Sequence, residues 1–451
     1  MIKFYLISFL SLFLLFQLPA KAQIPNEREI YFDTIKILWA DEKNSVEAVD
    51  KALSYQIKWP YIFSSKIDKI LVPILNSTTK TSGESAFLEK LYAKNDTTIN
   101  KIITPIYYWN KIHLAKKDSE KKLYLEKMTT YLNNSANYSN RTERFALMAV
   151  RDLENKKYSD TASIHLLYAK VKKNLSQFKN LEQSDFKADP NSQWQRHWFR
   201  NLTAYCYYQD YLKNPKNSKA LEGAVKFSPD FVDKSFIYEI ETEKSLLFGE
   251  SPIPDYHLVY FDYLTKNNQS KSALEHMTEV TLNEPTDQYM EILKKSYLAQ
   301  GLSETFVDFW KKKVEALMQP FPELSLTFNT NQTIDFSKPS EKWIYLDVWA
   351  TWCSPCVKEL PEIEKLYQSL KNNSELEMFT LSYESKDLNK FLGENKYTFP
   401  VTEVTTADIK FLGVKLFPTK FLMNPDKKYL VLPYGKWEEY TRNYGLFEIE
   451  K

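Results

Sequence analysis

Two cysteines separated by two residues are the part of this sequence best suited to chemistry. Cys353 and Cys356 are two of only three cysteines in 451 residues. They follow an apolar run that is typical of a buried strand, and a helix is predicted to begin at Ser354. A Cys-X-X-Cys pair at such a junction closes a small disulfide ring and places the first sulfur at the positive end of the helix. We therefore expect redox chemistry, with a Cys353 thiolate that forms more readily than an ordinary one.

A zinc site is the main structural alternative for these two cysteines. Zinc needs further ligands at suitable spacing, and neither a second cysteine pair nor paired histidines are visible among the five histidines of the chain. The sequence therefore predicts no metal site and no cofactor. The third cysteine, Cys206, lies in an aromatic stretch and is interpreted as a buried core thiol.

The N-terminus has the pattern of a secretory signal. Lys3 is followed by an apolar run from Phe4 to Phe16 and then by Pro19-Ala20-Lys21-Ala22, which predicts a signal peptide over residues 1–22. The protein is then exported and periplasmic, with no membrane span after cleavage; an uncleaved anchor, which would leave it membrane-associated, is the alternative. A single Cys-X-X-Cys in an exported chain of this size favours a reactive pair over a structural staple.

The overall charge gives no reason to expect a nucleic-acid partner. The chain has 60 Lys and Arg residues against 58 Asp and Glu residues, a formal net charge of +2. No strong positive field results. We predict no binding to nucleic acid.

Residues 23–318 are expected to form a large, mostly α-helical region. Polar or proline-bearing breaks at 183–191 and 249–254 would allow two subdomains. The clearest hairpin pairs Thr286–Gln300 with Ser303–Leu317 across Gly301, a residue suited to a helix C-terminus. On the second helix an apolar stripe is predicted to be buried, namely Phe306, Val307, Trp310, Val314 and Leu317.

Residues 319–451 have a different pattern, in which short strands alternate with helices. Strands are predicted at 324–328, 333–336, 343–349, 377–381, 420–423 and 429–432, and helices at 354–370, 386–394, 407–412 and 436–444. This alternation indicates an α/β domain with a central sheet flanked by helices. The whole chain is therefore predicted to be multidomain, with a helical N-terminal region and an α/β C-terminal domain.

Asp347 is the single acid in the apolar strand Trp343–Trp349. A carboxylate in a covered strand is unfavourable unless it is paired, hydrogen-bonded or protonated. Six residues before Cys353, it could reach the back of the disulfide and exchange a proton with Cys356. The alternative is an acid that points into solvent at a sheet edge, and the strand pattern alone leaves both open.

At this point the sequence resembles a known family. The segment Trp349-Ala350-Thr351-Trp352-Cys353-Ser354-Pro355-Cys356, followed by Lys358-Glu359-Leu360-Pro361, is similar to the active-site signature of exported thioredoxin-fold thiol-disulfide oxidoreductases of the TlpA/ResA type. A second segment, Gly413–Leu422, resembles the family segment that contains a cis-proline and the strand after it. The resemblance covers about residues 320–451.

The resemblance implies a role for each matching residue. Cys353 would be the nucleophile and Cys356 the resolving thiol of a redox disulfide, and Asp347 would match the buried acid of thioredoxins. The bond before Pro418 would be cis. The residues implied in binding the substrate are Trp352, Phe417, Pro418 and Thr419. Two departures from the family pattern, Ser354 and Phe417, affect positions that influence redox potential or substrate choice.

The resulting interpretation is an exported thiol-disulfide oxidoreductase that exchanges disulfides with protein substrates, with reduction as the favoured direction. It would need an external electron donor or acceptor protein as a second partner. The alternative is a helical binding or scaffold protein for a protein or polymer, with the thioredoxin-like domain as an accessory module. A peroxidase of the peroxiredoxin type is disfavoured, because Thr351 lies only two residues before Cys353 rather than three.

Overall fold

The computed structural model describes residues 42–59, 82–134, 137, 139–177, 190–228, 254–433 and 435–447, with a few single positions between 33 and 67. The predicted signal segment, 1–22, lies outside the described residues. The chain divides into two compact units. The first comprises residues 1–180 with 244–252, and the second comprises 181–243 with 253–451.

The first unit is helical in its described part. After a short 3-10 turn at Glu42–Asn44, the helices whose bounds lie in the described residues are α3 (Ser45–Lys58), α5 (Ser82–Ala93), α6 (Thr97–Leu114), α7 (Asp118–Asn133), α8 (Asn140–Asn155) and α9 (Thr161–Ser176). Side-chain caps fix several of their starts. Asp96 accepts from the Ile99 amide before α6, and Asp160 accepts from the Ser163 amide before α9.

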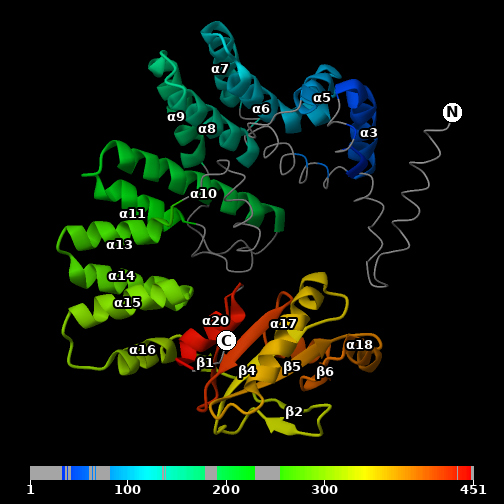
Figure 1. Cartoon of the computed structure of the whole chain (residues 1–451), viewed down its shortest axis with the longest axis vertical. Coiled ribbons are helices and arrows are strands. Elements are labelled where there is room, and N and C mark those ends of the chain that lie inside the picture. The colour runs from blue at the N-terminus through cyan, green and yellow to red at the C-terminus, as the bar shows by residue number, and fades with distance from the viewer. Residues whose placement is uncertain are drawn as a thin grey trace, which may run out of the picture. The chain divides into compact units, whose positions relative to one another are not determined.

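The second unit begins with further helices. These are α10 (Pro190–Lys213), α11 (Ser218–Phe227), α13 (Tyr256–Lys266), α14 (Ser270–Asn283), α15 (Asp287–Ala299) and α16 (Phe306–Glu315). Each of α13 to α16 contacts the next, and Figure 1 shows them as a stack. The α15 helix starts at a Thr286 cap and is followed by Gly301 at φ +61°, as predicted for this hairpin.

The predicted apolar stripe on α16 is only partly correct. Phe306, Trp310 and Val314 are buried, since their four-residue spacing puts them on one face of the helix. Val307 is 45% exposed, and Leu317 lies beyond the helix end and is 49% exposed. The stripe is therefore narrower than the sequence pattern suggested.

A six-stranded mixed sheet forms the centre of the C-terminal domain. Its order is β1-β8-β7-β4-β5-β6, and a separate hairpin joins β2 to β3. The strands are β1 (Gln319–Pro320), β2 (Ser325–Thr327), β3 (Thr333–Asp335), β4 (Trp343–Trp349), β5 (Leu376–Tyr383), β6 (Val401–Val404), β7 (Thr419–Met423) and β8 (Lys428–Val431). The β4-β5 and β5-β6 pairs are parallel, whereas β7 runs antiparallel to both β4 and β8.

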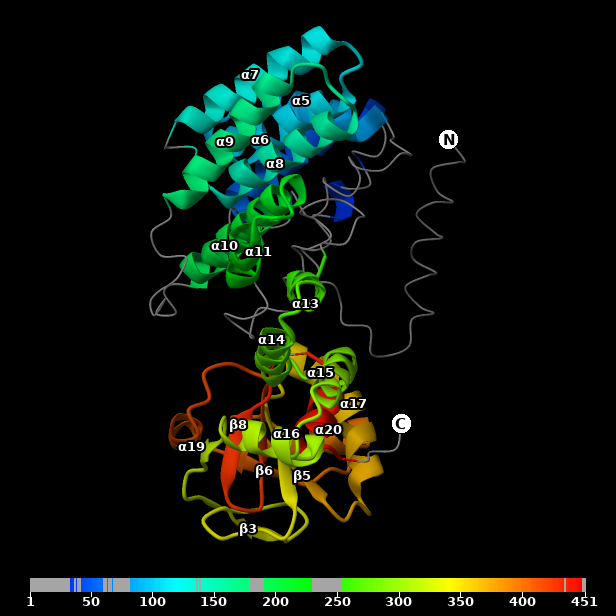
Figure 2. The same ribbon diagram turned by 90° about the vertical axis from the view of Figure 1, so that its left-hand side faces the viewer.

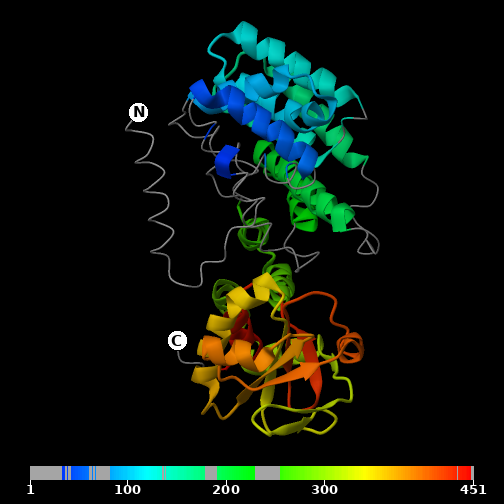
Figure 3. The same ribbon diagram turned by 90° about the vertical axis from the view of Figure 1, so that its right-hand side faces the viewer.

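Helices cover both faces of this sheet. The helices are α17 (Ser354–Leu370), α18 (Leu388–Asn395), α19 (Thr406–Phe411) and α20 (Trp437–Gly445). One core cluster joins α17, α18 and α20 to one face, and Figure 3 shows the yellow-orange α17 and the orange α18 on that face. A second cluster on the opposite face contains residues of α19 and of the β2-β3 region. The predicted central sheet with flanking helices is confirmed.

The helices before the domain share its core. The cluster that contains α17 and α20 also includes buried residues of α14, α15 and α16. Figures 1 and 2 both show α16 beside α20, and the two helices are in contact. The end of the helical stack and the α/β domain therefore bury apolar surface against each other.

Candidate active site

The two cysteines form a disulfide at the start of α17. The Cys353–Cys356 sulfur–sulfur distance is 2.05 Å. Cys353 is the N-cap of the helix, and its Sγ accepts a hydrogen bond from the Cys356 amide at 3.3 Å. Pro355 lies in the first turn, where its missing N–H is harmless. When the disulfide is reduced, the same amide and the helix dipole would stabilise a Cys353 thiolate.

Asp347 faces the α17 side of the sheet. Along β4, Ile344, Leu346 and Val348 belong to the core on the α19 face, whereas Tyr345 and Trp349 belong to the core under α17. Side chains alternate along a strand, so Asp347 points to the same side as Tyr345 and Trp349. It is 1% exposed and lies in the centre of the sheet, with β5 and β7 on either side. The solvent-facing alternative does not apply.

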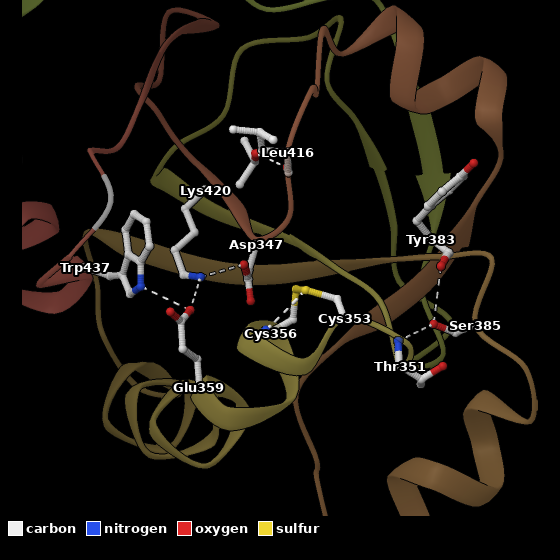
Figure 4. Close-up of a disulfide and its surroundings, with 11 residues drawn as sticks. Asp347, Thr351, Cys353, Cys356, Glu359, Tyr383, Ser385, Leu416, Lys420 and Trp437 are labelled. Carbon is white, nitrogen blue, oxygen red and sulfur yellow. Dashed lines mark hydrogen bonds and ion pairs between the residues drawn. A yellow bond between two sulfur atoms is a disulfide. The ribbon is translucent and has the colours of Figure 1, made fainter. Parts of the chain in front are cut away.

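A buried ion cluster surrounds this carboxyl. Lys420 Nζ lies 3.0 Å from Asp347 Oδ1 and 3.0 Å from Glu359 Oε2, and the lysine side chain is fully buried. Figure 4 draws Asp347 beside the disulfide, with Lys420 and Glu359 on its other side. The contact at Oδ1 is an ion pair, since no donor meets hydrogen-bond geometry at that oxygen. An uncompensated ammonium here would be very unfavourable, so the two carboxylates are needed to hold Lys420.

Burial controls the protonation of Asp347. Removal from water raises the pKa of Asp347, and the nearby Glu359 charge raises it further. The positive charge of Lys420 opposes both effects. Asp347 therefore holds a proton to a higher pH than an exposed aspartate does.

Sequence reasoning missed Lys420, Glu359 and the tryptophan that covers them. Trp437, the first residue of α20, places its ring 4.3 Å from Lys420 Nζ and donates from Nε1 to Glu359 Oε2 at 3.2 Å. A signal existed for Lys420, because it is the single charge in the apolar strand β7.

Aromatic side chains lie together next to the disulfide. Trp352 is 58% exposed, and its ring centroid is 5.4 Å from that of Phe417. Phe417 stacks in turn on Tyr383, at 5.3 Å and an interplanar angle of 6°. Tyr383, at the end of β5, was not predicted. These three rings give the surface beside Cys353 an apolar, aromatic character.

The remaining predicted residues lie at the start of β7. The Phe417–Pro418 peptide bond is cis, as the resemblance implied. Thr419 donates from Oγ1 to the Leu416 carbonyl at 2.6 Å, so its hydroxyl holds the chain around the proline. A serine pair holds the loop before Cys353: the Thr351 amide donates to Ser385 Oγ at 3.0 Å, and Ser385 accepts from Ser382 at 2.6 Å.

Two structural features are absent from the described residues. Among them, no group of three or more His, Cys, Asp and Glu side chains is placed to hold a metal ion. None of the helices in the part of the chain that the structure describes is both long and apolar enough to span a membrane.

The C-terminal part of the chain is similar in sequence to known proteins. Residues 317–428 match the family model described as AhpC/TSA family. Thiol-disulfide oxidoreductase ResA of Bacillus thuringiensis subsp. konkukian (strain 97-27) is 29% identical over 123 residues, which are 27% of this chain and 70% of that protein. Sporulation thiol-disulfide oxidoreductase A of Bacillus subtilis (strain 168) is 28% identical over 113 residues, 24% of this chain and 68% of that protein.

Similar solved structures include StoA from Bacillus subtilis, with 21% identity, a TM-score of 0.24, and coverage of 27% of this chain and 99% of that one. Another is the thioredoxin domain of a thiol-disulfide oxidoreductase from Bacteroides vulgatus. It has 18% identity and a TM-score of 0.24, and the match covers 28% of this chain and 91% of that one.

The C-terminal part of this chain is thus a thioredoxin-fold domain of the AhpC/TSA family, preceded by helical hairpins. Its sequence relatives are thiol-disulfide oxidoreductases of the ResA type. The class defined by the family and the cysteine pair is that of thioredoxin-like thiol-disulfide oxidoreductases, and the predicted family resemblance is confirmed.

Proposed function

We propose that this protein exchanges disulfides with protein substrates through Cys353 and Cys356, acting as a reductase. The observation that carries the proposal is the placement of the pair. The first sulfur caps α17 and accepts a backbone hydrogen bond, and Cys353 is 6% exposed against 1% for Cys356. A more accessible, stabilised thiolate is suited to attack, and a covered thiol is suited to resolution.

The proposed reaction has two steps. The Cys353 thiolate attacks one sulfur of the substrate disulfide, forms a mixed disulfide and releases the other substrate sulfur as a thiolate. Cys356 then loses its proton and attacks Cys353 Sγ, which expels the second substrate thiolate and forms the Cys353–Cys356 disulfide. Two electrons pass from the enzyme to the substrate. A separate electron donor protein must reduce the enzyme disulfide before the next cycle.

Asp347 is proposed as the acceptor of the Cys356 proton. It lies on the same side of the sheet as α17, and burial raises its pKa, which makes the carboxylate a stronger proton acceptor than an exposed aspartate. As Cys356 attacks, its proton would move to the Asp347 carboxylate. In the reverse direction, protonated Asp347 would return it to the Cys356 sulfur.

The substrate-binding residues are proposed to be Trp352, Phe417, Pro418 and Thr419. The exposed Trp352 ring and its contact with Phe417 support an apolar surface for a substrate segment. Tyr383 extends that surface through its stack on Phe417.

Export to the periplasm belongs to the same proposal. It is supported by the signal-like pattern of residues 1–22. The reaction also fits an oxidising compartment, where exported proteins form disulfides that need reduction or correction.

Trapping tests the proposed roles directly. In Cys356→Ser, Cys353 can still attack but the mixed disulfide cannot be resolved, so covalent adducts with substrate proteins should accumulate and disappear on addition of reductant. Cys353→Ser is the matched control and should trap nothing, because Cys356 is covered. Absence of adducts from a folded Cys356→Ser protein, together with no insulin reduction by the wild type, would refute the proposal and favour a helical binding protein.

A further inference from the structure

A lysine buried between two carboxylates and an indole links the redox site to the helical stack of α13 to α16. Asp347 and Glu359 occupy two sides of the Lys420 ammonium, and the Trp437 ring covers a third at 4.3 Å. The indole also donates to Glu359. Trp437 therefore contacts two members of the cluster and separates it from water on that side.

Trp437 belongs to a helix that is anchored outside the α/β domain. On α20, Arg442 Nη2 and Asn443 Nδ2 donate to Asp287 Oδ1 at 2.6 and 2.9 Å. Asn443 also donates to the Pro285 carbonyl at 2.8 Å and accepts from Trp310 Nε1 at 2.9 Å through its own carbonyl. The position of α20 is thus set by α15, α16 and the turn before α15.

Two tyrosines of α20 strengthen this anchor. Tyr444 donates to the Leu282 carbonyl at 2.7 Å, and Tyr440 donates to Glu284 at 3.2 Å. Both rings are almost fully buried. The helix is held along its length by polar and apolar contacts to the helical stack.

A cavity adjoins the ion cluster at the same junction. A cavity of about 470 Å³ is lined by Asp287 of α15, Glu359 of α17, and Trp437 and Arg442 of α20. Glu359 joins this cavity to Lys420 and so to Asp347. Movement of α20 would change how much water reaches Lys420 and Asp347.

We infer that Trp437 is a positioning residue for proton transfer at Asp347. The helices α15 and α16 hold Trp437 in place through their contacts with α20. The inference rests on the proposed function of the cysteine pair. It gives the helical region a role in the reaction. Asp287 holds α20, and α20 positions Trp437, which limits the access of water to Asp347.

The sign of the effect follows from the causes of the Asp347 shift. Desolvation is the largest of them and raises the pKa, so admission of water should lower it. The same water would also weaken the effect of the Lys420 charge, which lowers the pKa of Asp347. That effect is smaller than the effect of desolvation, so the pKa should still fall. The charged or titratable groups that face Asp347, or the cavity next to it, are Tyr345, Cys356, Glu359, Lys420, Asp287, Glu362, Lys436, Glu438, Glu439 and Arg442.

The test measures Asp347 itself. In the oxidised full-length protein, the protonated carboxyl is followed by infrared difference spectroscopy across pH and is assigned by its loss in Asp347→Asn. Trp437→Ala should lower the midpoint by about 1 pH unit. Trp437→Phe, which retains a ring over Lys420, should restore most of the wild-type value.

A second pair of variants, both in α15, tests the role of the helical stack. Asp287→Ala should shift the midpoint in the same direction as Trp437→Ala, because it removes the anchor of Arg442 and Asn443. Glu291→Ala, one turn further along α15, is the control: it removes only an exposed pair with Lys295 and should change nothing.

The outcomes separate the two proposals. An unchanged midpoint in Trp437→Ala would overturn the inference, and a shift in that variant but none in Asp287→Ala would overturn the part assigned to the helical stack. The oxidised protein needs no turnover for this measurement. A shifted midpoint in a protein without exchange activity would therefore count against the proposed function alone.

Discussion

At the scale of single residues, Asp347 and Lys420 show how a buried charge is made tolerable and useful. Neither would be stable alone in the core between β4 and α17. Paired across neighbouring strands and joined by Glu359, they form a cluster of two acids and one base. Burial raises the pKa of Asp347 in this cluster, and the Lys420 charge opposes that rise.

Replacing Asp347 by asparagine should slow the resolution of the mixed disulfide by roughly 100-fold near neutral pH, the size of effect expected for loss of a general base. The difference should shrink at high pH, where Cys356 ionises without help. Stopped-flow measurement of substrate release across pH checks this. A rate profile identical to that of the wild type would remove Asp347 from the mechanism.

Lys420→Met should move the same profile to higher pH. The lysine charge lowers the pKa of Asp347, so its loss raises the pKa, and the carboxylate needed as acceptor appears only at higher pH. Lys365→Met on α17 is the matched control, because Lys365 forms only an exposed pair with Glu362. A shift towards lower pH would contradict the assigned role of Lys420.

At the scale of secondary-structure elements, buried polar groups also fix how the N-terminal helices pack. Glu143 of α8 is fully buried and accepts from Asn174 of α9 at 2.9 Å. The same Asn174 donates to the Leu132 carbonyl of α7 at 3.3 Å. Burial raises the pKa of Glu143 to about 7, and its hydrogen bonds only partly oppose this. The three helices therefore meet at a carboxyl group that favours its neutral form.

The stability of these helices should consequently fall as pH rises. The folded-state pKa of Glu143 is raised, so its contribution is fully present below the unfolded value of 4.5 and is lost as pH rises through about 7. Glu143→Gln should be more stable than the wild type at pH 8, by at most about 3 kcal/mol, and little different at pH 4.5. Urea-dependent hydrogen exchange of the α8 amides, compared at equal pH, measures this. Equal stabilities at pH 8 would contradict it.

At the scale of the whole molecule, we propose that residues 319–451 form the thioredoxin-like domain and that it depends on the helices just before it. Tyr440 and Tyr444 of α20 and Trp310 of α16 are buried in one core cluster. Removal of α13 to α16 would expose these α20 side chains and leave their polar groups without protein partners.

A fragment of residues 254–451 should therefore fold cooperatively, whereas residues 319–451 alone should melt at least about 10 °C lower. Circular dichroism melts of the two fragments, both with the disulfide intact, provide the comparison. Equal midpoints would show that the boundary at residue 319 separates independent domains.

The sequence alone determined the features that depend on local order along the chain. The strand Trp343–Trp349, the cysteines that follow it and the helix from Ser354 are adjacent residues, and hydrophobic periodicity with helix-start chemistry suffices to place them. The out-of-place Asp347 could be recognised because its neighbours are apolar. By contrast, β6 was missed, because four residues with two polar members carry too weak a pattern.

Only the tertiary structure decided the partners of these residues. Lys420, Glu359 and Trp437 come from β7, α17 and α20, and no local pattern states that their side chains meet. The anchoring of α20 by Asp287 joins residues more than 150 positions apart. Such contacts follow from the register of β4 on β7 and from the packing of helices on the sheet. The chemistry of the cysteine pair could therefore be read from neighbouring residues, whereas its proton acceptor and the helices that support it depend on the fold.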